Sequence, residues 1–114
     1  MEQSVAFLKE KLVEPHFIKQ LIDQINKDFY RATQIEAVPL EATVHEIVVN
    51  VEIALKEIIH RDASKISTLL YLVDVPEIEV EQYLSTTTEN LLSVVTFLIL
   101  KREFQKVYLR NKIL

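Results

Sequence analysis

The 114-residue chain contains no glycine, and this absence restricts its possible folds and sites more than any other feature. Average usage would supply about eight glycines in a chain of this length. Walker phosphate loops, dinucleotide fingerprints, serine nucleophile elbows and EF-hand loops each need glycine, because their backbone takes a positive φ angle or closely approaches a ligand. The sequence excludes all four kinds of site, and it offers no glycine-containing turn for a tight β-hairpin.

Hydrophobic periodicity predicts an all-α fold: a compact bundle of five or six helices packed around a central C-terminal helix, in a single domain over residues 1–114. Proline residues separate successive periodic segments. The expected helices cover Ser4–Glu14, the segment from Pro15 through Phe29, Leu40–His60, Ala63–Val73, a short acidic segment ending near Leu84, and Glu89–Lys112. The first half of the last helix is apolar on every side, which predicts its central position.

The segment Ile47–Ile53 has a competing interpretation. Its β-branched residues and its alternating end also fit a strand. We favour a helix because the helical period persists over about five turns, whereas the alternation lasts about five residues.

Several helix starts carry capping signals. Asp74 and Glu77 have the spacing of a capping box. Asp62 or Ser64 is expected to cap the helix that ends near Val73. One of the three threonines at residues 86–88 is expected to cap the last helix.

Charge and cysteine content narrow the functional classes. The net charge of −4 disfavours non-specific binding to nucleic acid or to anionic membranes. Because the chain has no cysteine, it has no disulfide framework, no thiolate nucleophile and no zinc–thiolate site. No apolar run approaches the roughly twenty residues that a membrane-spanning helix needs, and the N-terminus lacks a secretory-signal pattern. We expect a cytoplasmic protein with no membrane partner.

Glu57 and His60 form the one motif that suggests metal chemistry. A Glu-x-x-His pair on a helix can present both side chains to an iron or manganese ion, but a di-metal bundle needs a second motif and two further inward glutamates. Both residues lie opposite the apolar side of their helix, which favours a solvated or salt-bridged pair. We expect no cofactor and no catalytic residue. A metal-dependent enzyme stays as the first alternative, since a symmetric dimer would bring two motifs together.

Arg102, Lys106 and Arg110 form a basic stripe at positions i, i+4 and i+8 of the last helix. Three interpretations remain open. The stripe contacts nucleic-acid phosphates, it docks an acidic protein surface, or it is a solvated face favoured by the negative end of the helix dipole. The acidic segment over residues 74–89, in the same chain or in a second copy, is a candidate for such an acidic surface.

Val49 and Ile53 provide the most informative functional signal. Both point away from the main apolar face of their helix, so a monomer would expose them, and clustered exposed apolar groups mark interfaces. The last helix is also apolar all round in a small chain, which suggests self-association, most commonly as a two-fold dimer. The sequence therefore favours a small, non-enzymatic protein-interaction or adaptor protein that forms a homodimer through Val49 and Ile53, with opposed charge patches setting the register.

Overall fold

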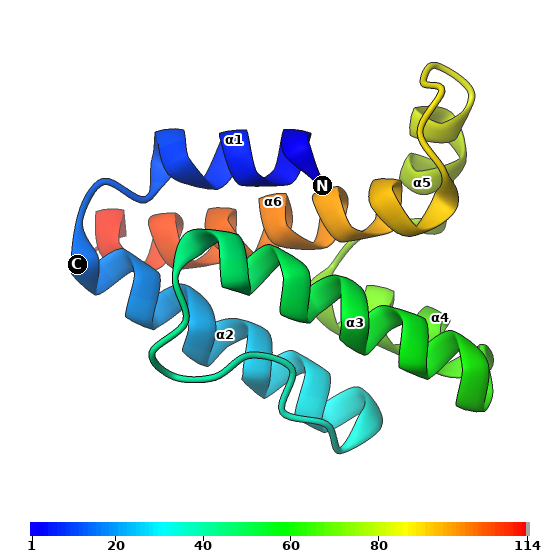
Figure 1. The fold of residues 1–114 in the computed structure, drawn as a ribbon, viewed down its shortest axis with the longest axis horizontal. Coiled ribbons are helices and arrows are strands. Elements are labelled where there is room, and N and C mark those ends of the chain that lie inside the picture. Colours follow the sequence, from blue (N-terminus) through cyan, green and yellow to red (C-terminus); the bar gives the residue numbers. More distant parts are fainter. Residues whose placement is uncertain (114) are drawn as a thin grey trace.

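The computed structural model describes residues 1–113, which form six α-helices (Figure 1). The helices are α1 (Glu2–Lys11), α2 (Pro15–Thr33), α3 (Val44–Asp62), α4 (Ser64–Val73), α5 (Glu77–Leu84) and α6 (Leu91–Ile113). These residues contain no strand, so the predicted all-α bundle is confirmed. The segment Ile47–Ile53 lies entirely within α3, which confirms the helix over the strand.

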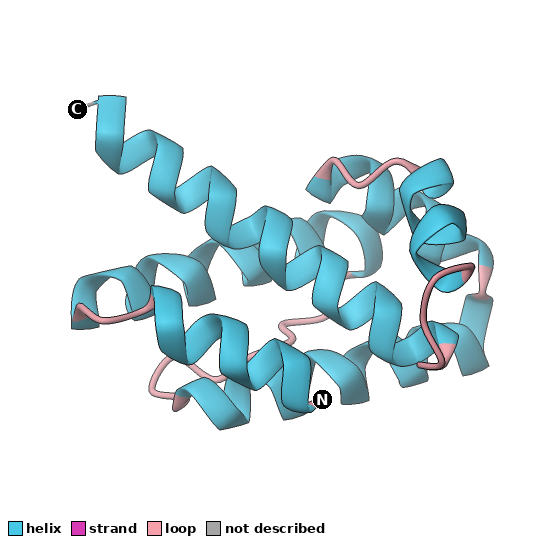
Figure 2. Cartoon of the chain, turned by 90° about the horizontal axis from the view of Figure 1, so that it is seen from above, coloured by secondary structure: helices cyan, strands magenta, loops and turns pink. Residues whose placement is uncertain are grey.

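The central element is α6, as the sequence predicted. It contacts each of the other five helices, and Figure 1 shows it lying between α1 on one side and α2 and α3 on the other. The seven consecutive residues Val94–Leu100 are all buried. A helix that is enclosed all round needs apolar residues all round. The C-terminal end of α6 extends past the other helices in the view of Figure 2, although Asn111 there donates a hydrogen bond to Gln20 Oε1 of α2 at 2.6 Å.

The helices α2 and α3 each bury one face against this centre. In α2, Leu21, Ile25 and Phe29 are fully buried, whereas the charged residues of its opposite face are exposed, as predicted: Lys19, Asp23 and Lys27. In α3 the buried face consists of Ile47, Val48, Val51, Leu55 and Ile58. Periodicity alone therefore identified the core faces of both long helices.

The capping box is found at α3 and not at Asp74. The Thr43 Oγ1 accepts a hydrogen bond from the Glu46 N–H at 3.2 Å, and the Glu46 Oε1 accepts one from the Thr43 N–H at 2.9 Å. This reciprocal pair fixes the first turn of α3, so the helix begins later than the expected Leu40. Asp74 instead ends α4 in a left-handed conformation with φ of 75°, and Pro76 precedes α5 without a side-chain cap.

The other two capping predictions name the wrong residues. The N-cap of α4 is Ala63, without a side-chain cap, although Asp62 Oδ1 accepts a hydrogen bond from the Ser64 N–H at 3.1 Å. At α6 the cap is Asn90 and not a threonine, because the Asn90 Oδ1 accepts a hydrogen bond from the Ser93 N–H at 2.9 Å. Gln34 and Asp74 end α2 and α4 in the left-handed backbone conformation that glycine usually adopts at helix ends. Because the chain has no glycine, residues with side chains take these two positions.

Candidate functional site

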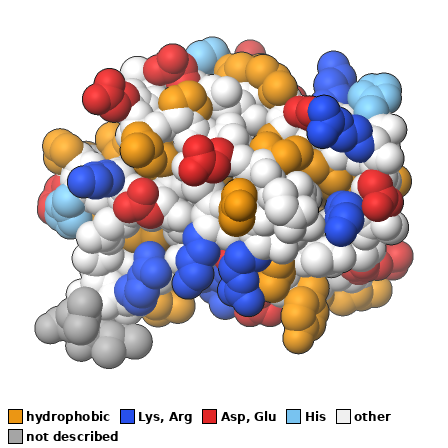
Figure 3. All heavy atoms as spheres, turned by 90° about the horizontal axis from the view of Figure 1, so that it is seen from below, with side chains coloured by type: hydrophobic (Ala, Val, Ile, Leu, Met, Phe, Trp, Pro, Cys, Tyr) orange, Lys and Arg blue, Asp and Glu red, His pale blue; other side chains and the backbone are white. Residues whose placement is uncertain are grey.

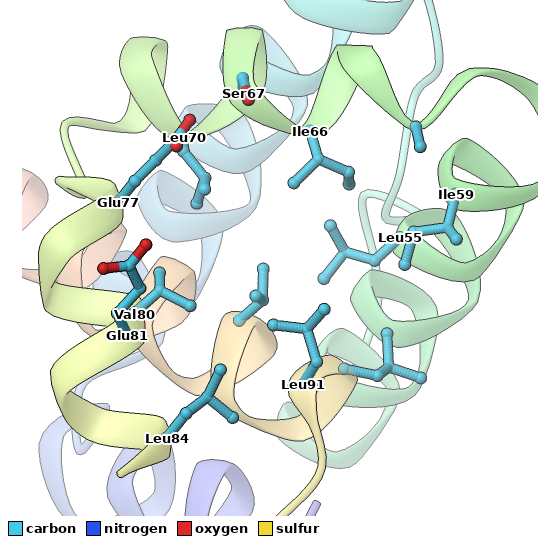
Figure 4. Close-up of a pocket in the computed structure, with 13 residues that line it drawn as sticks. Leu55, Ile59, Ile66, Ser67, Leu70, Glu77, Val80, Glu81, Leu84 and Leu91 are labelled. Carbon is cyan, nitrogen blue, oxygen red and sulfur yellow. The ribbon is translucent and has the colours of Figure 1, made fainter.

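An apolar groove opens on the surface between α3, α4, α5 and the start of α6 (Figure 4). Its volume is about 370 Å³, near the lower end of the range of small-molecule pockets, roughly 300–1,000 Å³. Aliphatic side chains from all four helices form its walls, among them Leu55, Ile59, Ile66, Leu70, Leu84 and Leu91.

The edge of the groove formed by α5 is acidic. Val80 and Leu84 are one turn apart on α5 and line the groove, and Glu77 and Glu81, also one turn apart, line it beside them. Both carboxylates are exposed, and the lining includes no lysine or arginine. A short amphipathic helix thus gives the groove an apolar wall and a negative rim.

Apolar residues at the groove remain in contact with solvent. Ile59 is 42% exposed and Leu91 is 52% exposed. The sequence pattern had placed Ile59 on the buried face of its helix, but at this end of α3 the groove takes the place of a covering helix. Other exposed apolar side chains, such as Ile53 and Tyr71, lie outside the groove, so Ile59 and Leu91 are only part of the exposed apolar surface of the molecule.

The predicted interface residues Val49 and Ile53 lie on the outer side of α3. Val49 is half-buried, and Ile53 is 57% exposed. Their neighbour Asn50 is polar and donates a hydrogen bond to the Glu46 carbonyl at 2.8 Å. One isoleucine and part of a valine are a small fraction of the roughly 1,000 Å² that a stable interface buries. An interface there stays a prediction that needs further surface from elsewhere.

The Glu-x-x-His motif gains no further ligand in the structure. Glu57 forms an i, i+4 salt bridge with Arg61 at 2.9 Å, and His60 is exposed. Across residues 1–113, no group of three or more histidine, aspartate or glutamate side chains is arranged to hold a metal ion. The pairing of Glu57 matches the salt-bridged interpretation of this motif.

The three cations of the basic stripe occupy three different environments. Arg102 Nη2 donates to Asp74 Oδ2 at 2.9 Å, so its partner comes from the acidic segment of the same chain. Lys106 is mostly buried, with 21% of its side chain exposed. Arg110 is exposed. The stripe is therefore not one continuous basic surface.

Lys106 belongs to a buried ionic cluster that joins α2, α4 and α6. Its Nζ lies 2.9 Å from Asp28 Oδ2 and 3.3 Å from Glu103 Oε1, and it donates to the Leu72 carbonyl at 2.9 Å. Gln24 Nε2 also donates to Asp28 Oδ2, at 3.1 Å. The side chains of Asp28 and Glu103 are 3% and 0% exposed. None of these residues lines the groove.

The pKa of Glu103 is raised to about 9, mainly by burial. A hydrogen bond from the protonated acid to Asp28 and the negative charge of Asp28 contribute to this rise, while Lys106 opposes it. As a carboxylate, Glu103 would face the Lys106 ammonium, 3.3 Å from its Oε1, which Asp28 and the Leu72 carbonyl already engage, whereas a protonated Glu103 donates to Asp28. The cluster at neutral pH is thus a neutral Glu103 beside an Asp28–Lys106 ion pair.

The sequence analysis missed Asp28 and Glu103, although the helical period contains a signal for both. Asp28 follows Leu21 and Ile25 on the buried stripe of α2. Glu103 lies one turn from Ile99 and one turn from Val107, both of which are fully buried. A charged residue flanked on its own stripe by core residues indicates a buried partner elsewhere.

The chain matches no protein-family model, no curated protein and no solved structure. Among residues 1–113, no helix combines the length and the hydrophobicity that crossing a membrane requires. The function is therefore inferred from the geometry of the groove and of the ionic cluster.

Proposed function

We propose that this chain is a small, non-enzymatic cytoplasmic interaction protein that holds the apolar face of a partner helix in the groove between α3, α4, α5 and α6. The groove is the observation that carries this proposal. Exposed apolar surface costs about 25 cal/mol per Å², and a partner that covers it removes that cost. Apolar surface rimmed by polar groups is typical of interaction sites.

The rim of the groove defines the chemistry of the occupant. Glu77 and Glu81 place two negative charges one turn apart beside the apolar wall. A helix laid into such a groove presents apolar anchors at i, i+3 or i+4, and i+7. Lysine or arginine beside those anchors would meet the two glutamates, whereas acidic side chains there would be repelled. The favoured occupant is an amphipathic helix with cationic flanks.

The two other functional classes have less support. A metal-dependent enzyme would need ligands beyond Glu57 and His60, and Glu57 already pairs with Arg61. Nucleic-acid binding would use the basic stripe, but Arg102 and Lys106 pair with Asp74 and Asp28. Neither class has a second observation in its favour.

A synthetic amphipathic peptide built from leucine and lysine tests the proposal. We expect saturable binding by isothermal titration calorimetry at low salt, weaker binding as salt increases, and no binding of the matching leucine and glutamate peptide. Ser67→Trp, which puts an indole ring at a groove-lining position, should abolish binding. Thr68→Trp is the matched control, because Thr68 is the exposed next residue and does not line the groove. Failure of the lysine peptide to bind, or binding that survives Ser67→Trp, would contradict the proposal.

A further inference from the structure

We propose that the occupant of the groove is the C-terminal end of α6 from a second copy of this chain, so that the protein forms a reciprocal two-fold dimer. This inference rests on the proposed function of the groove and names its partner. It is carried by a match in chemistry and in geometry between the two ends of α6.

The C-terminal end of α6 has the chemistry that the groove requires. Tyr108 is 46% exposed and Leu109 is 49% exposed, and Arg110 and Lys112 are exposed beside them. We call these four residues the basic end of α6. The Lys112 Nζ lies 5.9 Å from the centroid of the Tyr108 ring, so a cation accompanies the aromatic anchor.

The basic end is also positioned to reach another molecule. It extends past the other helices in the view of Figure 2; Asn111, on its inner side, donates a hydrogen bond to Gln20 Oε1 of α2 at 2.6 Å, which leaves the four residues of the basic end exposed. The space-filling view in Figure 3 shows that apolar side chains are dispersed among lysine, arginine and acidic side chains on that face of the molecule. A rigid helical end presents its anchors at a low cost in conformational entropy.

The geometry of α6 makes the contact reciprocal. Leu91 at the groove and Leu109 at the basic end lie roughly five turns apart, at about 3.6 residues per turn, so both point to the same side of the helix. Val95 and Leu98, between them on this side, are covered by their own chain, so the contacts lie at the two ends of α6. If two copies run antiparallel, Leu109 of each copy meets the groove of the other. Arg110 and Lys112 then approach the acidic rim at Glu77 and Glu81. The same contact forms twice, which closes the assembly as a two-fold dimer.

Light scattering of the full-length protein tests the inference. We expect a mass about twice the chain mass of 13.3 kDa at low salt, falling towards the chain mass as salt increases. Leu109→Glu should yield a folded monomer, because Leu109 is half exposed in the single chain. Ile53→Glu is the matched control, because Ile53 is a similarly exposed apolar residue that lies on α3. This variant should leave the dimer intact.

Mixing two monomeric variants tests the pairing of groove with basic end. Leu109→Glu retains the groove, and Leu91→Glu retains the basic end. Each should be monomeric alone, and an equimolar mixture should form a heterodimer with one of the two contacts intact. That heterodimer should be weaker than the wild-type dimer but stronger than either variant alone.

The possible failures are distinguishable. A dimer that Ile53→Glu dissociates and Leu109→Glu does not would overturn the inference and assign the interface to Val49 and Ile53. A wild-type protein that is monomeric at all concentrations would also overturn it. If that monomer still binds the leucine and lysine peptide, the proposed function stands with a different partner; if it does not, both proposals fail.

Discussion

Folded proteins usually bury apolar side chains and expose charged ones. The ionic cluster and the groove are opposite exceptions: the cluster buries charged groups, and the groove exposes apolar ones. In the cluster, Asp28, Glu103 and Lys106 place ionisable groups inside the bundle. In the groove, aliphatic side chains such as Leu91 face solvent. The cluster is complete, because each of its charges has an opposite charge or a proton within the chain. The groove is incomplete, because Ile59 and Leu91 on its walls remain about half exposed in the single chain. In the function proposed above, a second molecule covers them.

The comparison also predicts opposite responses to substitution. Removing one member of a buried ion pair leaves the other desolvated and unpaired, which is among the most destabilising single changes. Introducing a charge at an exposed apolar position changes the free energy of unfolding very little. Replacing a charged residue of the cluster by an apolar one should therefore be costly, whereas introducing a charge at an exposed apolar position of the groove should not be.

The largest effect is expected for Lys106→Met. Methionine retains an unbranched apolar stem but removes the cation, which leaves Asp28 as a buried carboxylate without its ion-pair partner. We expect the free energy of unfolding to fall by about 3–5 kcal/mol, measured by urea denaturation. Lys27→Met is the control, because Lys27 is exposed on α2 beside Asp28 in sequence. It should change the free energy of unfolding by no more than about 0.5 kcal/mol.

A double variant sharpens this prediction. Asp28→Asn removes the carboxylate that Lys106→Met leaves unpaired, so the two substitutions together should cost less than the sum of their separate effects. Additive losses would show that Asp28 and Lys106 are not energetically coupled, and that the cluster is not complete in the sense argued above.

The second effect is the pH dependence that Glu103 imposes on stability. The ordinary pKa of 4.5 is raised to about 9 in the folded chain, so the folded state holds one more proton than the unfolded state between these values. The contribution of Glu103 to the free energy of unfolding is therefore fully present below pH ~4.5 and is lost as the pH rises through ~9. The free energy of unfolding falls by at most about 1.4 kcal/mol per pH unit for this one proton.

Glu103→Gln is the variant that isolates this dependence. Glutamine is neutral at every pH and its amide can still donate to Asp28. We expect the decline in stability between about pH 6 and pH 9 to become shallower than in the wild type, measured by urea denaturation at each pH. An unchanged decline would mean that Glu103 is already ionised at neutral pH.

The contrast between the two regions also explains what the sequence could predict. The sequence predicts a central position for the first half of α6, because a helix that is apolar on every side has no polar face to expose to solvent. The amphipathic face of α2 was found for the same reason. These predictions depend on residues within one helix, where the period of about 3.6 residues determines which side chains share a face.

The cluster and the groove depend on contacts between helices that are distant in sequence. Asp28 is stabilised inside the bundle only because Lys106 approaches it from α6. The groove exists because α5 packs on α6 in a position that leaves Ile59 and Leu91 uncovered. The hydrophobic pattern within one helix contains no information about how closely another helix packs against it. This is why the basic stripe was interpreted as one surface, while the structure divides it into three environments.

A smaller effect is expected for Arg102→Ala. Arg102 pairs with Asp74 at 2.9 Å, but 69% of the Asp74 side chain is exposed, so water and salt screen the ion pair. We expect a loss of at most about 1 kcal/mol in the free energy of unfolding, and a smaller loss at high salt. Arg110→Ala serves as the control on the same stripe and should have no measurable effect. A loss comparable to that of Lys106→Met would place Arg102 in the buried cluster.

The smallest effect on stability is expected for Leu91→Glu, even though it puts a charge on an apolar wall. Leu91 is 52% exposed, so the carboxylate stays hydrated and the melting temperature should barely change. Leu98→Glu, about two turns further along the same helix, is the contrasting variant. Leu98 is 2% exposed, and the same substitution there should prevent folding. Leu91→Glu should nevertheless abolish dimerisation and weaken peptide binding, because it replaces an apolar wall of the groove by a charge. A stable Leu91→Glu variant that still dimerises would show that the groove, although incomplete, is not where the second copy binds.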